Sequence, residues 1–514
     1  MRLTWSLRRA MQVRPDGIAT IDGERRRSWR EVGERVARFA AALRKLGIAP
    51  GERVAVVAHN CDAFFEAYMA ILWAGAVIVP LNTRLNRREL AAQIDDAGAR
   101  ALLFGAEFAE TAAVLRSQCA GLQTCIGLDG AAAPADHGFE ALVARHEPLP
   151  DHPGTADDLA ALFYTSGTSG AAKGVMLLYR NLAAMALNLI MQLEADEDCV
   201  NLHCAPMFHL GDVGTFMTTI VGGTHVFVRQ LNEEVIMRLI AEHRVTHACT
   251  VPAVIDRMAR HPASATADLS SLRLLGYGGA PMPAGTFELA RQRFPKVDFA
   301  QGYGLTEMGS HTYLGPRHHR IDANPEKRRS AGQASYGFEV RVVDADGVEV
   351  PRRTVGQVIG RGDNVMAGYW NRPEETARAL VDGWLQTGDA GYMDEDGFVY
   401  ITDRLRDMIV TGAENVYSIE VENVVSRHPL VAECSVIGVP DERWGERVHA
   451  IVVTKPGATL EFADLDAFCR AELAAYKCPR SLDVRTEPLP RSAAGKVLKR
   501  ELREVFWKGR DRRV

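Results

Sequence analysis

The sequence predicts an α/β protein: a large N-terminal domain of layered α/β sheets with a β-rich subdomain, followed by a small α+β domain. Three observations predict this arrangement. Helix-like and strand-like segments alternate through about the first 300 residues, which is typical of largely parallel sheets covered by helices. From about residue 340 the pattern changes to short strands with acidic turns. After Asp403 it changes again, to a compact run of strands and helices.

The first helix and strand of the α/β region are predicted between residues 28 and 58. Ser28 opens the helix, and Glu31 three residues later completes a capping box. Gly47 ends it, and residues 54–58 follow as a short apolar strand. The apolar face of this helix consists of Val32, Val36, Phe39, Leu43 and Leu46. Helices and strands of this kind then keep alternating.

Two Asp-Gly segments predict hairpins in the β-rich subdomain, at about residues 335–403. Residues 340–350 read VRVVDADGVEV, and residues 391–401 read GYMDEDGFVYI. Apolar and polar residues alternate on both sides of each turn, as in a β-hairpin. These hairpins predict the β-rich subdomain, which we assign to the N-terminal domain, residues 1–403.

Residues 404–514 are expected to form the separate α+β domain. Helices are predicted at about residues 420–427 and 460–473, with apolar strands at about 435–439 and 449–453. No low-complexity linker precedes them, so the boundary is expected to be a short hinge.

The composition is that of an ordinary globular protein and argues against several classes of function. The 514 residues carry a net charge of −5, so no nucleic-acid partner is expected. Nine scattered cysteines without zinc-type spacing favour a cytoplasmic location and no zinc site. The longest apolar stretch, residues 67–80, is too short to span a membrane. The Arg-rich first residues lack the apolar region of a secretory signal and leave a transit peptide open.

Residues 164–175, YTSGTSGAAKGV, predict a pyrophosphate-binding loop. An apolar run leads into alternating hydroxyl residues and glycines, so that backbone N–H groups and hydroxyls approach an anion. Lys173 adds a positive charge, and because it precedes a glycine the loop is not a Walker motif. The loop residues expected to bind ATP, besides Lys173, are Thr165, Ser166, Gly167, Thr168, Ser169 and Gly170.

This loop and the motifs that follow it resemble the adenylate-forming superfamily of acyl-CoA synthetases, luciferases and peptide-synthetase adenylation domains. The motifs keep the family's order over about 330 residues: APMFH (205–209), GYGGAP (276–281), QGYGLTE (301–307), TGD (387–389) and RSAAGK (491–496). The resemblance implies an AMP-forming acid–thiol ligase that uses ATP, Mg²⁺ and coenzyme A. It also implies that the small C-terminal domain is mobile.

The QGYGLTE motif is expected to bind the nucleotide. Gly302 and Gly304 flatten the backbone beside Tyr303, which suits an aromatic ring stacking on adenine. By resemblance Thr306 and Glu307 are catalytic, and Glu307 holds Mg²⁺ against the phosphates. A carboxylate in the TGD turn suits the ribose hydroxyls. The other residues implied to bind ATP or AMP are Gly279, Ala280, Pro281, Gln301, Asp389 and Arg404.

The C-terminal region supplies the last implied catalytic residue and the thiol site. Lys496 lies beside small residues, so its loop can move the Lys496 ammonium into a site formed by other residues. The resemblance implies that Lys496 bridges the substrate carboxylate and the α-phosphate. Arg406 stands at the hinge, where Asp or Lys is common. Gly412, Ala413 and Trp444 are implied to contact CoA, with Ala413 replacing a common glycine.

His209, the last residue of APMFH, is placed by the resemblance at the mouth of the acyl pocket and is included among the catalytic residues. A packing role is the alternative, because an isolated histidine beside a phenylalanine is usually a core residue. Gly211, Gly214 and Thr215 are small and suggest a roomy pocket wall, and Gly278 is placed in the acyl pocket too.

We therefore expect an ATP-dependent acyl-CoA ligase for a medium- or long-chain fatty acid or an aryl acid. Free CoA is favoured because no carrier module follows Lys496, and a homodimer is left open. The alternatives are an amino-acid-adenylating enzyme or one with another acceptor, a luciferase-like oxygenase, and a non-catalytic nucleotide- or acyl-binding relative. Leu210 follows His209 where amino-acid-activating enzymes place Asp, which argues against the first.

Overall fold

The computed structural model describes most of the chain, namely residues 1–130, 134–165, 172–212, 214–320, 324–405, 407–411, 414–491 and 497–508. The fold divides into two compact units. The first contains Met1–Val340 and Gly360–Gln386, and the second contains Arg341–Ile359 and Thr387–Val514. The domain boundary expected between residues 403 and 404 stays a prediction.

The first unit contains an eight-stranded sheet, whose central strands pair in parallel as expected. Alternate residues of β3 enter two different apolar cores: Val54 and Val56 pack in one, and Ala55 and Val57 in the other. Both faces of the sheet are therefore buried. In spatial order the strands are β19 (Gly368–Tyr369), β9 (Lys173–Leu178), β8 (Leu159–Thr165), β4 (Val77–Pro80), β3 (Arg53–Val57), β5 (Ala99–Phe104), β6 (Thr124–Gly127) and β7 (His137–Gly138).

A nine-stranded sheet completes the sheets of the first unit. The five pairings from β14 to β1 are parallel, and antiparallel strands add to both edges. In spatial order the strands are β16 (Gln333–Ala334), β15 (Gly309–Leu314), β14 (Asp298–Leu305), β13 (Leu274–Gly278), β12 (His247–Thr250), β10 (Val200–His203), β11 (Thr224–Phe227), β1 (Ile18–Asp22) and β2 (Arg25–Ser28).

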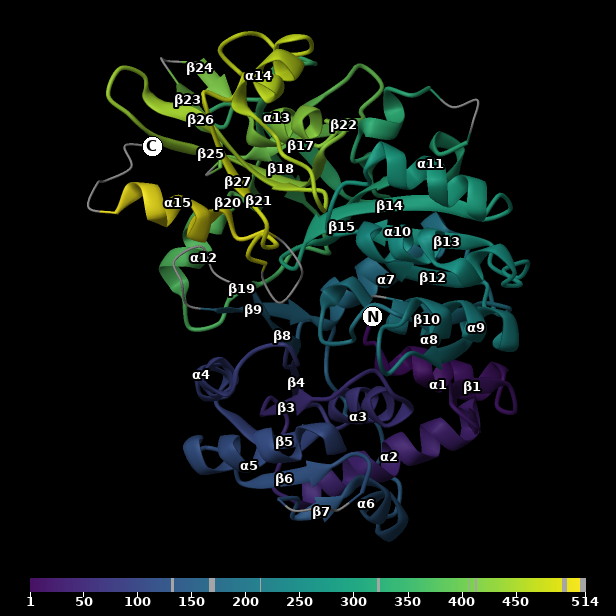
Figure 1. Cartoon of the computed structure of the whole chain (residues 1–514). Helices are drawn as coiled ribbons and strands as arrows, with labels where there is room; N and C mark the ends of the chain where they lie inside the picture. Colours follow the sequence, from purple (N-terminus) through teal and green to yellow (C-terminus); the bar gives the residue numbers. More distant parts are fainter. Residues whose placement is uncertain are drawn as a thin grey trace. The chain divides into compact units, whose positions relative to one another are not determined.

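Helices cover these sheets and alternate with the strands along the chain (Figure 1). The capping box of α2 forms as predicted: the Ser28 side chain accepts from the Glu31 N–H, and the Glu31 carboxylate accepts from the Ser28 N–H at 2.7 Å. The helices of this unit are α1 (Thr4–Val13), α2 (Trp29–Lys45), α3 (Asp62–Trp73), α4 (Arg87–Ala97), α5 (Ala109–Gln118), α6 (Phe139–Arg145), α7 (Tyr179–Leu193), α8 (Gly214–Val221), α9 (Glu233–His243), α10 (Pro252–Arg260), α11 (Ala284–Arg293) and α12 (Pro373–Ala379).

Helix α3 differs from the others because it is buried on all sides. Every one of its residues, from Asp62 to Trp73, is buried. The apolar stretch 67–80 therefore consists of the end of α3 and of β4, and both belong to the core, as its sequence predicts. A polar atom on such a helix has no access to bulk water. The Tyr68 hydroxyl can therefore form a hydrogen bond only with a neighbouring group or a bound ligand.

The region predicted to be β-rich contains a five-stranded sheet. The hairpin at residues 391–401 forms between β21 and β22, with Gly391 opposite Ile401. The hairpin at residues 340–350 is shorter than expected, since it closes through a single bridge between Val343 and Glu349. The strands are β17 (Glu339–Val343), β18 (Gly356–Arg361), β21 (Trp384–Met393) and β20 (Leu380–Val381), with β22 (Val399–Arg404) beside β21.

The C-terminal part of the second unit has the predicted helices and strands. Its strands are β24 (Glu414–Val416), β23 (Ile409–Thr411), β26 (Gly445–Thr454) and β25 (Val431–Asp441), with β27 (Ser481–Arg485) beside β26. Its helices are α13 (Ser418–Val425), α14 (Phe462–Arg470) and α15 (Lys499–Trp507). The helix predicted at 460–473 is therefore real but shorter.

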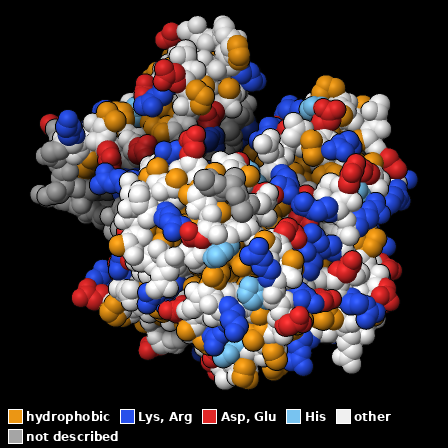
Figure 2. Space-filling model, turned by 90° about the horizontal axis from the view of Figure 1, so that it is seen from below, with side chains coloured by type: hydrophobic (Ala, Val, Ile, Leu, Met, Phe, Trp, Pro, Cys, Tyr) orange, Lys and Arg blue, Asp and Glu red, His pale blue; other side chains and the backbone are white. Residues whose placement is uncertain are grey.

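Basic and acidic side chains are interspersed on the face of the molecule drawn in Figure 2. This distribution agrees with the small net charge of −5. In the part of the chain that the structure describes, no helix has the length and apolarity needed to cross a membrane.

Candidate active site

A cluster of charged and aromatic side chains lies where the predicted pyrophosphate loop begins and ends. Thr165 ends β8 and pairs with Lys173, the first residue of β9, so the two strands hold both ends of the loop together. The Lys173 ammonium forms an ion pair with Glu375 and lies 5.0 Å from the centre of the Tyr369 ring. The Tyr369 hydroxyl donates to Glu307 Oε1 at 2.8 Å. Two residues predicted from separate motifs therefore meet through Tyr369.

The electrostatics of this cluster follow from its contacts. The hydrogen bond and charge of Lys173 hold the pKa of Glu375 below its ordinary value. Burial, and then the Glu307 carboxylate, raise the pKa of Tyr369, so its hydroxyl remains a donor. In this arrangement Glu375 neutralises Lys173, the cation that is predicted to bind the phosphates.

Glu307 suits a magnesium ion by the chemistry of its donor atoms. It lies in the turn between β14 and β15, next to Thr306. One carboxylate oxygen accepts from Tyr369, and the other has no hydrogen-bond partner among the described residues. Mg²⁺ is usually bound by one or two carboxylates together with substrate phosphates and waters. A half-buried carboxylate with one oxygen of this kind fits that requirement.

Glycines bring the strands of the predicted adenine site very close together. A Cβ at Gly304 would lie 1.5 Å from the Gly309 carbonyl oxygen, and one at Gly278 would lie 2.8 Å from that of Gly302. Gly279 has a positive φ of 75°, which starts the turn into Ala280 and Pro281. Side chains other than hydrogen are therefore excluded here for steric reasons.

The other residues of the QGYGLTE motif take their positions from β14. Gln301 accepts a hydrogen bond from the Tyr277 hydroxyl at 3.1 Å, and the half-buried Tyr303 ring packs against the larger core of the unit. The strand thus presents one polar and one aromatic side chain two positions apart. This arrangement agrees with the expected recognition of a nucleotide base.

Asp389 and Arg404, both predicted to bind ribose, lie opposite each other in β21 and β22 of the second unit. Arg404 Nε lies 2.7 Å from Asp389 Oδ1, and Asp389 is only 2 % exposed. The antiparallel register brings the two residues together although 14 residues separate them. The pair holds the carboxylate in a fixed orientation.

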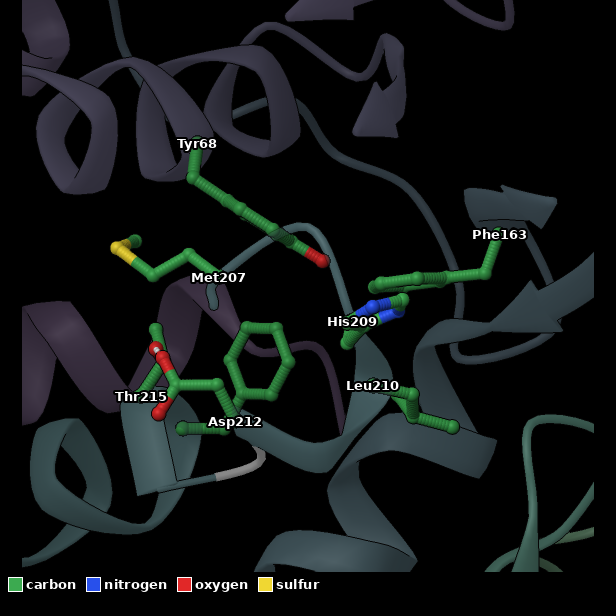
Figure 3. Close-up of a pocket in the computed structure, with 8 residues that line it drawn as sticks. Tyr68, Phe163, Met207, His209, Leu210, Asp212 and Thr215 are labelled. Atoms are coloured by element: carbon green, nitrogen blue, oxygen red, sulfur yellow. Dashed lines mark hydrogen bonds between the residues drawn. The ribbon is translucent and has the colours of Figure 1, made fainter. Parts of the chain in front are cut away.

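A small pocket lies beside His209 (Figure 3). Its free volume is about 10 Å³, so an acid can enter only if lining side chains change rotamer. Gly211, Gly214 and Gly278 are not among the described residues that line it. The lining residues come from α3, β8, the segment after β10 and α8, and they are Tyr68, Phe163, Met207, His209, Leu210, Asp212, Thr215 and Phe216.

A buried polar network supports one wall of this pocket. Asp212 is 8 % exposed and accepts a hydrogen bond from Thr215 Oγ1 at 3.0 Å. His203 Nδ1 lies 2.8 Å from Asp212 Oδ2, and His203 Nε2 lies 2.9 Å from His225 Nδ1. Burial, and then the neighbouring His203, lower the pKa of His225 well below its ordinary value. His225 is therefore neutral at physiological pH.

Trp444, the predicted CoA contact, lies close to two cations in the second unit. It sits in the turn that joins β25 to β26, where its backbone N–H donates to Asp441 Oδ1 at 3.0 Å. The Arg443 and Arg480 guanidinium carbons lie 4.6 and 5.4 Å from the centre of the indole ring. An aromatic ring with basic neighbours suits a phosphorylated nucleotide.

Several predicted residues fall outside the part of the chain that the structure describes. They are Ser166, Gly167, Thr168, Ser169, Gly170, Arg406, Gly412, Ala413 and Lys496. Conversely, sequence reasoning did not select Tyr369 and Glu375, which lie in residues 360–376, GRGDNVMAGYWNRPEET. It also missed Tyr68, Phe163 and Asp212, which belong to no motif.

Comparisons with known proteins agree with the motifs. The family model described as AMP-binding enzyme matches residues 7–370, and the AMP-binding enzyme C-terminal domain matches residues 420–496. The chain is 39 % identical over 506 residues to a feruloyl-CoA synthase of Amycolatopsis, with 98 % of both chains covered. It is 35 % identical to a long-chain-fatty-acid–CoA ligase of Mycobacterium tuberculosis, again over 98 % of both chains.

A solved structure gives the same result for the fold. The chain resembles ATP-bound MatB from Rhodopseudomonas palustris with a TM-score of 0.88 and 31 % identity, over 98 % of this chain and 99 % of that one. The predicted α/β fold class, the resemblance to adenylate-forming enzymes, and the use of ATP, Mg²⁺ and CoA are thereby confirmed. This chain belongs to the AMP-binding enzyme family, and it is an AMP-forming acid–thiol ligase that works through an acyl-adenylate.

Proposed function

We propose that this ligase makes the CoA thioester of an aryl or a medium- to long-chain fatty acid, with the residues predicted from its motifs in the roles given below. The observation that carries the proposal is the cluster in which Lys173 and Glu307 meet through Tyr369. It joins the predicted phosphate loop to the predicted metal ligand. Relatives named for ferulate and for long-chain fatty acids support these two acid classes.

The substrate carboxylate is a poor acyl donor, so the chemistry assigned to these residues begins by activating it. One oxygen of the substrate carboxylate attacks the α-phosphorus of ATP, the bond to the bridging oxygen breaks, and pyrophosphate leaves with its electron pair. Lys173 binds the departing phosphates, and Lys496 stabilises the charge that develops between the carboxylate and the α-phosphate. Mg²⁺, when held by Glu307, neutralises phosphate charge. The product is a mixed anhydride in which AMP has become the leaving group.

In the second half-reaction the CoA thiolate attacks the acyl carbon, and AMP leaves. Trp444, with Arg443 and Arg480 beside its ring, is assigned to the CoA nucleotide. We retain the hinge at Arg406 and the domain boundary at residue 404, because one site must serve two reactions and a rotating domain exchanges their residues. Acyl transfer thus follows adenylation without release of the adenylate.

A variant of Lys496 separates the two half-reactions. Lys496→Ala should abolish pyrophosphate release with acid and ATP, while thioester formation from supplied acyl-AMP and CoA is largely kept. Wild-type AMP release should be measured with fatty, aryl, short-chain and amino acids, each with and without CoA. Unchanged pyrophosphate release in the variant contradicts the role of Lys496. Efficient AMP release with amino acids, and with none of the other acids, contradicts the proposed acid class.

Two further features of the chain are part of the proposal. The nine cysteines are all free thiols in the structure, which supports a cytoplasmic, reducing environment. A homodimer remains a prediction, and light scattering of the purified protein tests it.

A further inference from the structure

The hydroxyl of Tyr68 is the feature of the acyl pocket that the reaction above does not use. Tyr68 lies on the buried helix α3 and is only 3 % exposed. Its hydroxyl has no hydrogen-bond partner anywhere in the described parts of the chain. Figure 3 shows the side chain reaching into the pocket, with the hydroxyl directed towards His209 and Phe163. A buried polar group in this state is costly unless something binds it.

The packing around Tyr68 fixes the direction of its hydroxyl. The Phe216 ring meets the Tyr68 ring edge-on, with centroids 5.4 Å apart and an interplanar angle of 73°. Phe64, one turn earlier on α3, stacks on the Tyr68 ring with a centroid distance of 6.5 Å. Because Tyr68 is buried and packs against both rings, it cannot turn its hydroxyl to another partner without disturbing the core. The hydroxyl is therefore preorganised for a group inside the pocket.

The charge near Tyr68 decides whether its hydroxyl donates or accepts. Burial, and then the negative charge of Asp212, raise the pKa of Tyr68, so the hydroxyl keeps its proton at every physiological pH. The Asp212 carboxylate is itself occupied by Thr215 and His203. Tyr68 is thus a neutral donor that needs an acceptor, and an oxygen atom of the substrate is the simplest one.

The rest of the lining restricts the kind of molecule that carries this oxygen. Phe163, Phe216 and the Tyr68 ring give the pocket aromatic walls, which pack well against a flat ring. A saturated fatty chain would fill the same space but would leave the Tyr68 hydroxyl without an acceptor. The combination of aromatic walls and one isolated donor favours an oxygenated aromatic acid.

We propose that Tyr68 determines the specificity of this ligase by donating a hydrogen bond to a hydroxyl or ether oxygen on the ring of an aromatic acid. This inference rests on the proposed function, because it names the acid that the same site activates. A site that hydrogen-bonds a substrate oxygen discriminates strongly against the analogue without it, since the buried donor then stays unpaired.

The test compares two acids that differ by one oxygen. We expect wild-type kcat/KM for CoA-dependent AMP release to be at least about tenfold higher with 4-hydroxycinnamate than with cinnamate. Tyr68→Phe, which removes only the hydroxyl, should lower this preference about tenfold, mainly through the hydroxylated acid, as expected for one hydrogen bond. An unchanged preference, or an equal loss with both acids, overturns the assignment.

Stability measurements separate this role from a structural one. Removing a donor that has no partner should leave the Tm of Tyr68→Phe unchanged or raise it. The matched control is Tyr179→Phe, outside the pocket, whose hydroxyl donates to the Leu72 carbonyl at 2.8 Å. This control should lower Tm and leave the ratio of the two acids unchanged. A fall in Tm for Tyr68→Phe as large as that of the control contradicts the proposal.

Two further measurements distinguish failure of this inference from failure of the proposed function. If the wild type releases AMP with hexadecanoate or decanoate but with neither aromatic acid, the Tyr68 inference fails and the ligase function stands. If no acid yields AMP, the proposed function fails. Calorimetric binding of the two cinnamates to the wild type and Tyr68→Phe then decides the Tyr68 assignment: a preference lost in the variant supports it, and no preference overturns it.

Discussion

The phosphate cluster (Lys173, Glu307, Tyr369 and Glu375) and the acyl pocket are built in opposite ways, although both belong to the first unit. In the cluster, charged groups are already paired: Lys173 with Glu375, and Glu307 with Tyr369. In the pocket, the Tyr68 hydroxyl has no partner among the described residues, and the Tyr68 ring packs against Phe64 and Phe216. Paired charges suit exchange for those of ATP, whereas an unpaired donor suits selection of one substrate. We therefore predict that the first arrangement serves the common reaction and that the second serves specificity.

The largest effect should come from the cluster. Glu307→Gln removes the carboxylate charge that faces the predicted metal position, and we expect pyrophosphate release to fall about 100-fold or more. The measurement is kcat/KM for ATP at saturating acid. Glu374→Gln on the neighbouring α12 is the control, since that side chain is 85 % exposed, and its activity should stay within about twofold of the wild type. A loss below about threefold for Glu307→Gln would remove it from the catalytic residues.

The network behind the pocket should have a large effect on stability. Asp212→Asn removes the charge that faces His203, and we expect the free energy of unfolding to fall by about 3 kcal/mol, because a buried partner is left uncompensated. Urea denaturation measures this change. Asp157→Asn, a surface change at a side chain that is 72 % exposed, should have almost no effect. Equal stability of the two variants would show that the network is not needed for the fold.

The two regions should also differ in their response to acid. The pKa of His225 is lowered by burial, so below pH 6.5 the unfolded chain binds a proton that the folded chain does not. Above pH 6.5 His225 is therefore not expected to reduce the free energy of unfolding. At pH 5.5 its effect should lower that free energy by about 1.4 kcal/mol. The pKa of Glu375 is lowered by Lys173, so its contribution is lost only below pH 4.5.

Denaturation at pH 7.0 and pH 5.5 tests this difference. The stability of the wild type should decrease between these values, and His225→Gln should reduce that decrease by about 1.4 kcal/mol. Glu375→Gln should leave the decrease unchanged. An identical pH response of the wild type and His225→Gln would mean that His225 is not neutral in the folded protein.

The smallest effect is expected from the ion pair that neutralises Lys173. Glu375→Gln should lower KM for ATP about threefold, because the pair is partly exposed and such pairs contribute little. The effect should vanish in a Lys173→Ala background, since the substitution acts through the lysine. A change of KM that persists in that background would place the influence of Glu375 elsewhere.

Much of the fold was predictable because its signals are local. The Ser28–Glu31 capping box, the hairpin at residues 391–401 and the mostly parallel sheets all follow from spacing within short windows. The hairpin at residues 340–350 was overestimated, because only one bridge closes it and register depends on neighbouring strands. Helix α12 was not anticipated, since it interrupts a region of short strands.

By itself, the sequence determined the family and the reaction. Phosphate binding, metal binding and carboxylate activation need fixed residues at fixed spacings, and a motif such as YTSGTSGAAKGV records them. Only the tertiary structure decided which side chains line the pocket beside His209. Tyr68, Phe163 and Asp212 come from three separate elements, and no spacing in the chain relates them. Tyr68 in particular is hidden in the apolar run of α3, where its unpaired hydroxyl becomes evident only once the helix is packed.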